Sequence, residues 1–293
     1  MRSRGIGPNR ICYTAAIKAC GKGGRWETAL DLFREMRDRD IKPGIVSYNT
    51  AISACGQCGQ WEKALLLLRE MGGDGIAPDV VTYSAAISAC EKGGQWNRAL
   101  ELLGEMHRRR LMPNVKSYSA AMSACEKGGR WKEALELLRE MRVSGIEPNE
   151  YTYNAAVGAC FKRSRYKEAA DAIREGQADK IYPIFAFEQY SEWDLHGLSF
   201  PESCMLLTQA LSSAAARSES YESASFWDIA VITGRGSVLR DNVVRFLSER
   251  SGPEMKMMEE NDGAFLVTVE ALRNWAESSR LEDFKRAFQY EEE

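Results

Sequence analysis

Two short motifs in the C-terminal third of the sequence could act on a phosphate group. Asp194 and His196 stand two residues apart in a strand-like segment, so their side chains share one face. A carboxylate beside an imidazole can orient it or raise its basicity, which suits general acid–base chemistry. The second motif pairs two glycines, which let the backbone approach an anion at a helix start, with an arginine that adds a charge-assisted contact. It consists of Thr233, Gly234, Arg235 and Gly236.

The elements that must position these motifs alternate along residues 185–275. Strand-like segments are expected at Trp193–His196, Trp227–Ile232, Met255–Met258 and Phe265–Val269, and helices at Pro201–Arg217 and Val238–Arg250. This β-α-β-α-β-β order predicts a small α/β sandwich domain. A last helix, Glu270–Tyr290, and an acidic tail are expected to follow it.

A period of 35 residues runs through the rest of the chain, and several independent columns share it. They are Pro8, Pro43, Pro78, Pro113, Pro148 and Pro183; Tyr13, Tyr48, Tyr83, Tyr118 and Tyr153; Trp26, Trp61, Trp96 and Trp131, with Tyr166 next; and Met36, Met71, Met106 and Met141. Such agreement indicates an internal repeat.

Each repeat is predicted to be a helical hairpin. In one unit, Val81–Ala89 and Trp96–Arg108 have helical patterns, Glu91–Gly94 forms the turn, and Pro113 ends the unit. A hairpin cannot bury its apolar face alone, so consecutive units are expected to stack into a right-handed superhelix. The Trp, Met, Leu and Cys columns are then core, and one cysteine per repeat indicates small buried thiols in a reducing compartment.

Charge is divided unevenly along the chain. Up to residue 184 there are 29 Lys and Arg against 22 Asp and Glu, whereas the remainder has 10 against 20, so the first part carries +7 and the second −10. A surface that binds a polyanion is therefore expected in the first part. We expect neither a membrane span nor secretion, because the apolar runs are short and Met1–Arg10 lacks an apolar signal core.

The repeat resembles the pentatricopeptide repeat. Val81-Thr82-Tyr83-Ser84, the run Ala99–Met106 and Pro113-Asn114 carry the likeness, and tetratricopeptide repeats step by 34 rather than 35 residues. The resemblance implies an α-helical solenoid that binds single-stranded RNA base by base. Its five repeats are residues 10–44, 45–79, 80–114, 115–149 and 150–184, and residues 1–9 are expected to end a truncated preceding repeat.

In this family the fifth and the last residue of each unit read one base. Short polar side chains suit this task, because they hold donors and acceptors close to a rigid backbone. By position, the pairs are Thr14 with Gly44, Asn49 with Asp79, Ser84 with Asn114, Ser119 with Asn149, and Asn154 with Ile184. The family's code implies U for the second pair and A for the third and fourth, hence a core N-U-A-A-N, while the outer pairs leave their bases undefined.

Two further columns fit RNA binding. The second residue of each unit is expected to stack between bases, and these residues are Ile11, Val46, Val81, Lys116 and Tyr151. Contacts to RNA phosphates are expected from Lys22, Lys92, Lys127 and Lys162, with Gln57 in the remaining repeat. Helix capping is an alternative reason for polar residues near a helix start, and a protein-binding solenoid is an alternative to RNA binding.

The C-terminal motifs resemble the small MutS-related, or SMR, domain, which has an LDxH and a TGxG motif. Here Trp193 stands where that family usually has Leu, a change that affects packing more than chemistry. The resemblance implies RNA cleavage, with His196 as acid or base, Asp194 as its orienter or a metal ligand, and Mg²⁺ as the candidate cofactor. A domain kept as a nucleic-acid clamp is the alternative. Together the two resemblances point to proteins of chloroplasts or mitochondria that act in RNA processing or stability.

Two other features predict little chemistry. Cys55 and Cys58 have CxxC spacing, but no second pair or nearby His accompanies them, so no metal site is predicted. The basic run His107–Arg110 lies at a helix end, where cations complement the helix dipole.

Overall fold

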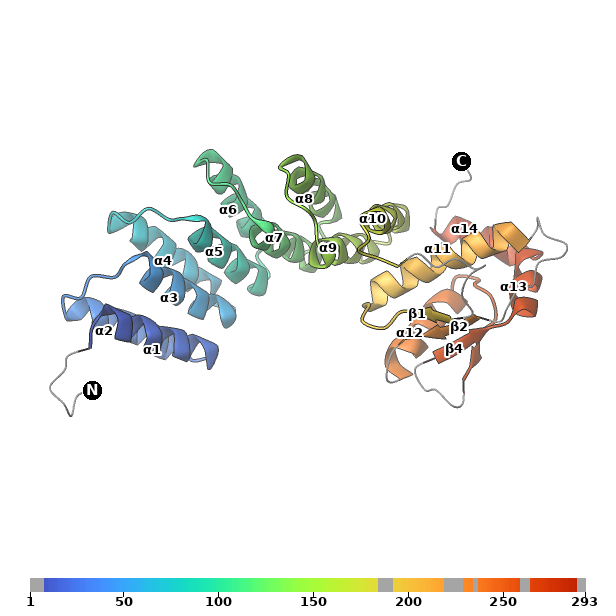
Figure 1. Ribbon diagram of the computed structural model, residues 1–293, viewed down its shortest axis with the longest axis horizontal. Coiled ribbons are helices and arrows are strands. Elements are labelled where there is room, and N and C mark those ends of the chain that lie inside the picture. Colours follow the sequence, from blue (N-terminus) through green and yellow to red (C-terminus); the bar gives the residue numbers. More distant parts are fainter. Residues whose placement is uncertain (1–7, 184–191, 219–228, 234–236, 259–263, 289–293) are drawn as a thin grey trace. The chain divides into compact units, whose positions relative to one another are not determined.

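The computed structural model describes residues 8–183, 192–218, 229–233, 237–258 and 264–288, which Figure 1 draws in colour. The chain divides into two compact units, Met1–Ala155 and Ala156–Glu293. The first is built of helices, and the second combines helices with a small sheet. Of the helices in the described segments, none is long and apolar enough to cross a membrane.

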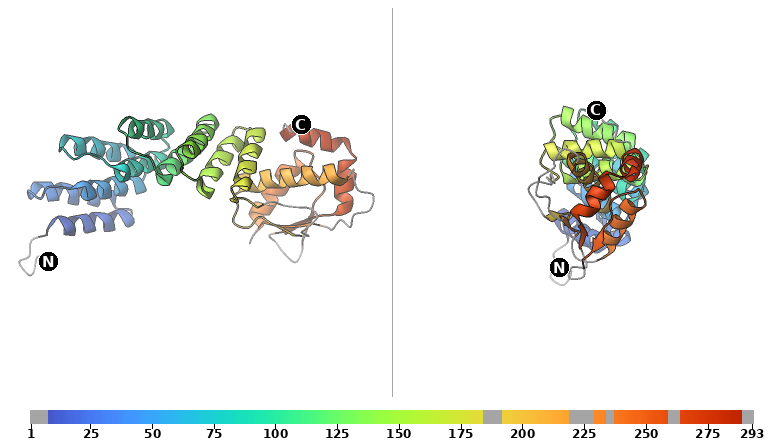
Figure 2. Two further views of the ribbon diagram at one scale, coloured as in Figure 1. Left: turned by 45° about the horizontal axis from the view of Figure 1, so that its top comes forward. Right: turned by 90° about the vertical axis from the view of Figure 1, so that its right-hand side faces the viewer.

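Helical hairpins follow one another at the predicted 35-residue step (Figure 1). Their first helices are α1 (Arg10–Lys22), α3 (Ile45–Gln57), α5 (Val80–Lys92), α7 (Val115–Lys127) and α9 (Glu150–Phe161). Their second helices are α2 (Trp26–Asp38), α4 (Trp61–Gly73), α6 (Trp96–Arg108), α8 (Trp131–Val143) and α10 (Tyr166–Ala178). The predicted helical-repeat solenoid is confirmed. Both figures of the whole chain show α1, α3, α5 and α7 side by side (Figure 2).

Glycine makes the turn inside the first four hairpins, and Ser164 takes its place in the fifth. Gly24, Gly59, Gly94 and Gly129 have φ between +63° and +70°, a left-handed conformation that glycine adopts without steric cost. The first helix runs further than predicted, since α5 includes Glu91 and Lys92. The Gly93 amide still donates to the Ala89 carbonyl, 2.9 Å away, so the turn is confined to the glycines.

The core of the hairpins consists of the tyrosine, methionine and alanine columns and most of the cysteine column. Tyr48, Met71 and Cys90 are among the fully buried side chains. The tryptophans were predicted to be core, but Trp26, Trp61, Trp96 and Trp131 are only half-buried. Two of them lie against a glycine of the next hairpin: a Cβ on Gly93 would be 2.3 Å from Cδ1 of Trp61, and one on Gly128 would be 2.5 Å from Cδ1 of Trp96. These two indoles each cover a glycine of the next hairpin, and the Arg130 guanidinium lies over the Trp96 ring, 4.3 Å from its centroid.

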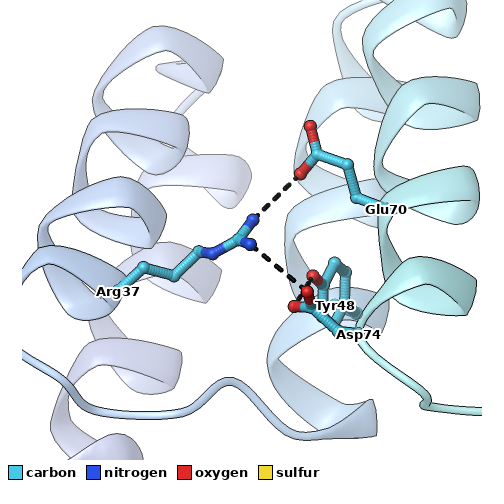
Figure 3. A network of polar contacts seen from close by, with 4 residues as sticks. All are labelled: Arg37, Tyr48, Glu70 and Asp74. Carbon is cyan, nitrogen blue, oxygen red and sulfur yellow. Dashed lines mark hydrogen bonds and ion pairs between the residues drawn. The ribbon is translucent and has the colours of Figure 1, made fainter.

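Polar contacts join neighbouring hairpins on the side of the second helices. Figure 3 shows Arg37 of α2 bonded to Glu70 at 3.2 Å and to Asp74 at 3.3 Å. The Tyr48 hydroxyl donates to the same Asp74 carboxylate at 2.6 Å. Burial and this carboxylate both raise the pKa of Tyr48, so the hydroxyl stays protonated and remains a donor.

The second unit contains a four-stranded sheet in the order β1-β2-β4-β3. Its strands are β1 (Glu192–Asp194), β2 (Ile229–Ile232), β3 (Lys256–Met257) and β4 (Ala264–Val267). β1 and β2 are parallel, and β4 runs antiparallel to both β2 and β3. With α11 (Phe200–Ser218) after β1 and α12 (Ser237–Ser248) after β2, the chain has the predicted β-α-β-α-β-β order.

The C-terminal helix differs from the prediction. The expected helix Glu270–Tyr290 is two helices, α13 (Val269–Ala276) and α14 (Ser279–Phe288). β4 ends before the predicted Val269 because the Thr268 hydroxyl accepts the Ala271 amide at 3.1 Å and so caps α13. The chain is helical from Val269 onward and Thr268 is its cap, so the strand stops at Val267.

An aromatic cluster forms part of the core of the second unit. The ring centroid of Phe246 in α12 lies 5.1 Å from Phe161, 5.9 Å from Phe200 and 5.7 Å from Phe288. Tyr166 of α10 contacts the same ring at 6.0 Å. The end of α9 and α10 therefore share a core with α11, α12 and α14.

Candidate nucleic-acid interface

A groove of about 900 Å³ runs across the first helices of the first four hairpins. We call it the first-helix groove. It is lined by Arg10, Ile11, Thr14, Ala15, Lys18, Gly21, Lys22, Gly44, Ile45, Val46, Ser47, Asn49, Thr50, Ser53, Ala54, Gln57, Asp79, Val81, Ala85 and Lys116. Predicted base-reading, stacking and phosphate-binding residues thus share one surface.

The second base-reading pair is held by a hydrogen-bonded cluster. Asn49 Nδ2 donates to Asp79 Oδ1 at 3.4 Å, and the Thr82 hydroxyl lies 2.6 Å from Asn49 Oδ1 and 2.7 Å from Asp79 Oδ1. The Thr82 amide also donates to Asp79 Oδ1, at 2.8 Å. Because these contacts use Oδ1 of Asp79, its Oδ2 takes part in none of them.

Asp79 is an ionised acceptor at neutral pH. Burial alone would raise the pKa of its carboxyl, but hydrogen bonds from the amide and hydroxyl of Thr82 and from Asn49 outweigh that effect and hold the pKa below its usual value. A charged oxygen at the groove therefore favours a ligand that offers an N–H or O–H donor.

The neighbouring repeats use the same geometry. Ser84 lies 2.7 Å from Ser117, oxygen to oxygen, and Thr14 lies 2.9 Å from Ser47. The third residue of one hairpin thus contacts the fifth residue of the preceding hairpin. This column was not predicted to take part in the site, although the same 35-residue step marks it. Its members are fully buried: Ser47, Thr82, Ser117 and Thr152.

Helix capping, the alternative explanation for the polar columns, also occurs. Asp79 and Asn114 cap α5 and α7 through their side chains, and the Thr152 amide donates to Asn149 Oδ1 at 3.1 Å. Gly44 caps α3 without a side chain. Asp79 therefore both caps a helix and lines the first-helix groove, whereas Asn114 and Asn149 cap helices without lining it. Ser119 and Asn154 are half-buried, and Ile184 lies outside the described residues.

The predicted stacking column is exposed, although four of its five members are apolar or aromatic. Ile11 is 75% exposed, Val46 64%, Val81 58% and Tyr151 77%, and Lys116 is exposed as well. Such a column leaves apolar area in water unless a ligand covers it. The first three and Lys116 line the first-helix groove.

The predicted lysine column is less uniform. Lys22 lines the groove and Lys92 and Lys162 are exposed, but Lys127 forms an ion pair with Glu91 of the preceding repeat. Its charge is therefore partly neutralised by the protein. Arg10 and Lys18 also line the groove and were not predicted. Their spacing from Lys22, in steps of four on α1, could have revealed them.

Asp194 and Thr233, one residue from each C-terminal motif, lie at the carboxyl ends of neighbouring parallel strands. Asp194 is the last residue of β1 and pairs with Ile232, the last residue of the parallel strand β2. Thr233 follows Ile232 directly. Thr233 is buried, whereas the predicted Gly234, Arg235 and Gly236 lie outside the described residues.

Asp194 and His196 are exposed, while Trp193 before them and Leu195 between them are fully buried. The strand ends at Asp194 rather than at His196, because the Asp194 carboxylate accepts the backbone amide of His196 at 2.8 Å and Gly197 turns the chain with φ +87°. The Asp194 carboxylate therefore binds the backbone amide of His196 and not its imidazole, which it was predicted to orient. The His196 ring is left open to solvent.

The described segments contain no group of three or more His, Cys, Asp or Glu side chains that could hold a metal ion. At the CxxC spacing, burial raises the pKa of the Cys55 thiol to about 11, and Cys58 Sγ lies 3.4 Å from the Gly24 carbonyl. A protonated thiol is a poor metal ligand.

Comparisons with known proteins match the helical part. The pattern of the PPR repeat family matches residues 8–50, 43–92, 79–127 and 120–162, which together exceed half of the chain. The pentatricopeptide repeat protein PPR10 from maize is similar with a TM-score of 0.57 and 25% identity, over 83% of this chain and 32% of that one. Among curated proteins no match was found.

Two similar structures contain RNA. PPR10 in complex with an 18-nt psaJ RNA element gives a TM-score of 0.55 and 21% identity, over 73% of this chain and 29% of that one. The PPR domain of Arabidopsis thaliana protein-only RNase P 1 in complex with tRNA gives a TM-score of 0.52 and 17% identity, over 60% of this chain and 92% of that one. At these identities the likeness shows the fold, and this chain spans about a third of the length of PPR10.

Proposed function

The chain belongs to the PPR repeat family, and on this premise we propose that its hairpins bind single-stranded RNA along the first-helix groove. The observation that carries the proposal is the groove itself, which places polar pairs, exposed apolar side chains and cations on one surface. A protein-binding solenoid would need no such alternation of stacking and hydrogen-bonding positions.

In this binding mode each base lies between two residues of the stacking column. Val46 and Val81 flank the position that faces Asn49 and Asp79, and a stacked base contributes about 1–3 kcal/mol to binding. Three repeats have complete code pairs, so we expect a short footprint and modest affinity.

For the second repeat the family's code implies uracil, and the hydrogen-bonding groups of its base-reading pair match that base. The ionised Asp79 accepts an N–H, and the Asn49 amide donates to a carbonyl, a pattern that matches N3–H and an adjacent carbonyl of uracil. Cytosine and adenine present an unprotonated ring nitrogen on that edge and are disfavoured. With A read by Ser84 and Asn114 and by Ser119 and Asn149, the proposed core is N-U-A-A-N.

The same chain is proposed to cleave bound RNA through its C-terminal unit. The supporting observation is that the parallel strand ends bring Asp194 and His196 beside Thr233. His196, exposed at the end of β1, would move a proton, and Asp194 would position the turn that carries it. No group of metal ligands exists among the described residues, so no step is assigned to Mg²⁺. An RNA-binding protein that protects its target is the alternative, and residence in a chloroplast or mitochondrion is proposed on family grounds alone.

One experiment tests both parts. End-labelled RNA with a UAA core, and a matched RNA with CAA, are incubated with the wild type, with Asp79→Asn and with Asp194→Ala/His196→Ala, each with and without Mg²⁺, and bound and cleaved species are resolved. Asp79→Asn keeps a helix-capping side chain but removes the carboxylate. We expect the wild type to prefer UAA about tenfold and Asp79→Asn to lose that preference.

Cleavage by the wild type that disappears in the double variant, with binding unchanged, supports an endonuclease. If the wild type and the double variant bind the RNA equally and neither cleaves it, the protective function replaces the proposed endonuclease. An unchanged preference in Asp79→Asn contradicts the assigned register, and binding to neither RNA contradicts the proposal.

A further inference from the structure

The first repeat has no side chain at its last position. The next three repeats carry Asp79, Asn114 and Asn149 there, whereas the first carries Gly44. A Cβ on Gly44 would lie 3.2 Å from Nη1 and 3.7 Å from Cζ of Arg10. The Arg10 guanidinium therefore occupies the space that the missing side chain leaves, and both residues line the first-helix groove.

Arg10 differs in kind from its counterparts. The other first residues of the repeats are Ile45, Val80, Val115 and Glu150, none of which carries a positive charge. Arg10 is exposed at the first turn of α1. Its five N–H donors lie in a rigid planar fork that matches two adjacent acceptors.

Thr14 adds an acceptor beside this fork. Its hydroxyl donates to the Arg10 carbonyl at 2.9 Å, so the contact with Ser47, also 2.9 Å, has Ser47 as donor. A hydroxyl has one proton and two lone pairs, which leaves one lone pair of Thr14 for a ligand. The first repeat thus presents two parallel donors and one acceptor.

We propose that Arg10 determines the base read by the first repeat and selects guanine. This inference rests on the proposed RNA binding and extends its core from N-U-A-A to G-U-A-A. Guanine offers O6 and N7 as adjacent acceptors, the pair that arginine most often binds in nucleic acids. Adenine and uracil alternate donors with acceptors along their edges, and the O2 of cytosine lies next to its ribose.

The test measures the affinity of the full chain for four RNAs that differ only in the base before UAA. We expect the wild type to bind G-U-A-A about tenfold more tightly than A-U-A-A or U-U-A-A. Arg10→Lys keeps the charge but removes the fork, so it should lose the preference. Lys18→Ala, which removes another cation from the same groove, should weaken all four complexes alike and keep the preference.

A gain-of-side-chain variant gives an independent measurement. Gly44 has φ −110° and ψ 177°, an extended conformation open to any residue, and the atom that a new side chain meets is the flexible end of Arg10. Gly44→Asn should therefore fold normally, displace the guanidinium and reduce the preference for guanine.

Three outcomes overturn the inference. Equal weakening of all four RNAs by Arg10→Lys and Arg10→Ala, with a salt slope lower by about one in Arg10→Ala, would make Arg10 a phosphate contact. A wild type that prefers the UAA RNA to the CAA RNA but binds these four RNAs equally would refute guanine selection and leave the proposed function standing. Binding to none of the RNAs would remove both.

Discussion

The junction between the first two hairpins and the junction that follows differ at one position. Arg37 follows Met36 at the end of α2, whereas Gly72 follows Met71 in α4. Arg37 reaches two carboxylates of the next hairpin (Figure 3), but glycine has no side chain that could do so. At the second junction Arg109 binds Glu105 within α6 instead, with Nε 2.8 Å from Oε1.

The tyrosine contact is common to both junctions. The Tyr83 hydroxyl donates to Glu105 at 2.7 Å, as Tyr48 does to Asp74. In the next hairpin Tyr118 donates to Glu140 at 3.1 Å, and His107 of the preceding hairpin lies 3.2 Å from the same carboxylate. The tyrosine–carboxylate pair therefore belongs to the hairpin, while the side chain that reaches it from the preceding hairpin differs between junctions.

At the second junction, where Gly72 stands in place of Arg37, an open space remains. A cavity of about 520 Å³ lies at the second junction, and Gly72, Arg98, Glu105 and Arg108 are among its lining residues. The comparison thus predicts that the two junctions depend equally on tyrosine and unequally on charge.

The largest effect is expected from removing the tyrosine hydroxyl. Tyr48→Phe and Tyr83→Phe should each lower the free energy of unfolding by about 1.5 kcal/mol, because each loses a hydrogen bond to a carboxylate. Urea denaturation of both variants measures this. A difference above about 1 kcal/mol between them would show that Arg37 and Tyr48 act as one network, against the comparison.

A smaller gain is expected from supplying the missing cation. Gly72→Arg should raise the free energy of unfolding by about 1 kcal/mol, since it improves helix propensity and can pair with Glu105. Gly73→Arg is the matched control, because that position is also helical and open but does not correspond to Arg37. If both variants raise the free energy of unfolding equally, an ion pair between the new arginine and Glu105 contributes nothing to stability.

The smallest effect is expected from Arg37→Gln. Its partners are partly exposed, so the loss should be about 0.5 kcal/mol and should shrink in high salt. Arg34→Gln, which breaks only a pair with Asp31 inside α2, should cost less. If thermal unfolding ranks Arg34→Gln as the more damaging change, the pairing between hairpins has no special weight.

The hairpins were predictable because their signals are local. Trp96 begins α6 as predicted, since periodicity and the glycine turn act within a few residues. The contacts between hairpins were not: the Asn49–Thr82 bond and the Glu91–Lys127 pair depend on how consecutive units rotate, which a repeat period does not specify. The half-burial of the tryptophans has the same cause.

In the C-terminal unit the order of elements was predictable, but the ends of the strands and their register were not. Asp194 and His196 were predicted to lie on one strand, but β1 ends at Asp194, whose carboxylate accepts the His196 amide. The Leu195 amide donates to the Ile232 carbonyl of β2, whereas the next amide, that of His196, donates to the Asp194 carboxylate. A propensity pattern does not predict such a local side-chain bond.

The contact of Trp61 with Gly93, and of Trp96 with Gly128, limits how the array can be rebuilt. The third and fourth hairpins each present a side-chain-free turn residue to the preceding hairpin and carry a tryptophan at the start of their second helix. Cys58 and Arg163 stand at the corresponding turn positions of the second and fifth hairpins. The third and fourth hairpins can therefore serve as interchangeable cassettes behind any tryptophan-bearing neighbour, whereas the second and fifth are fitted to their own places in the series.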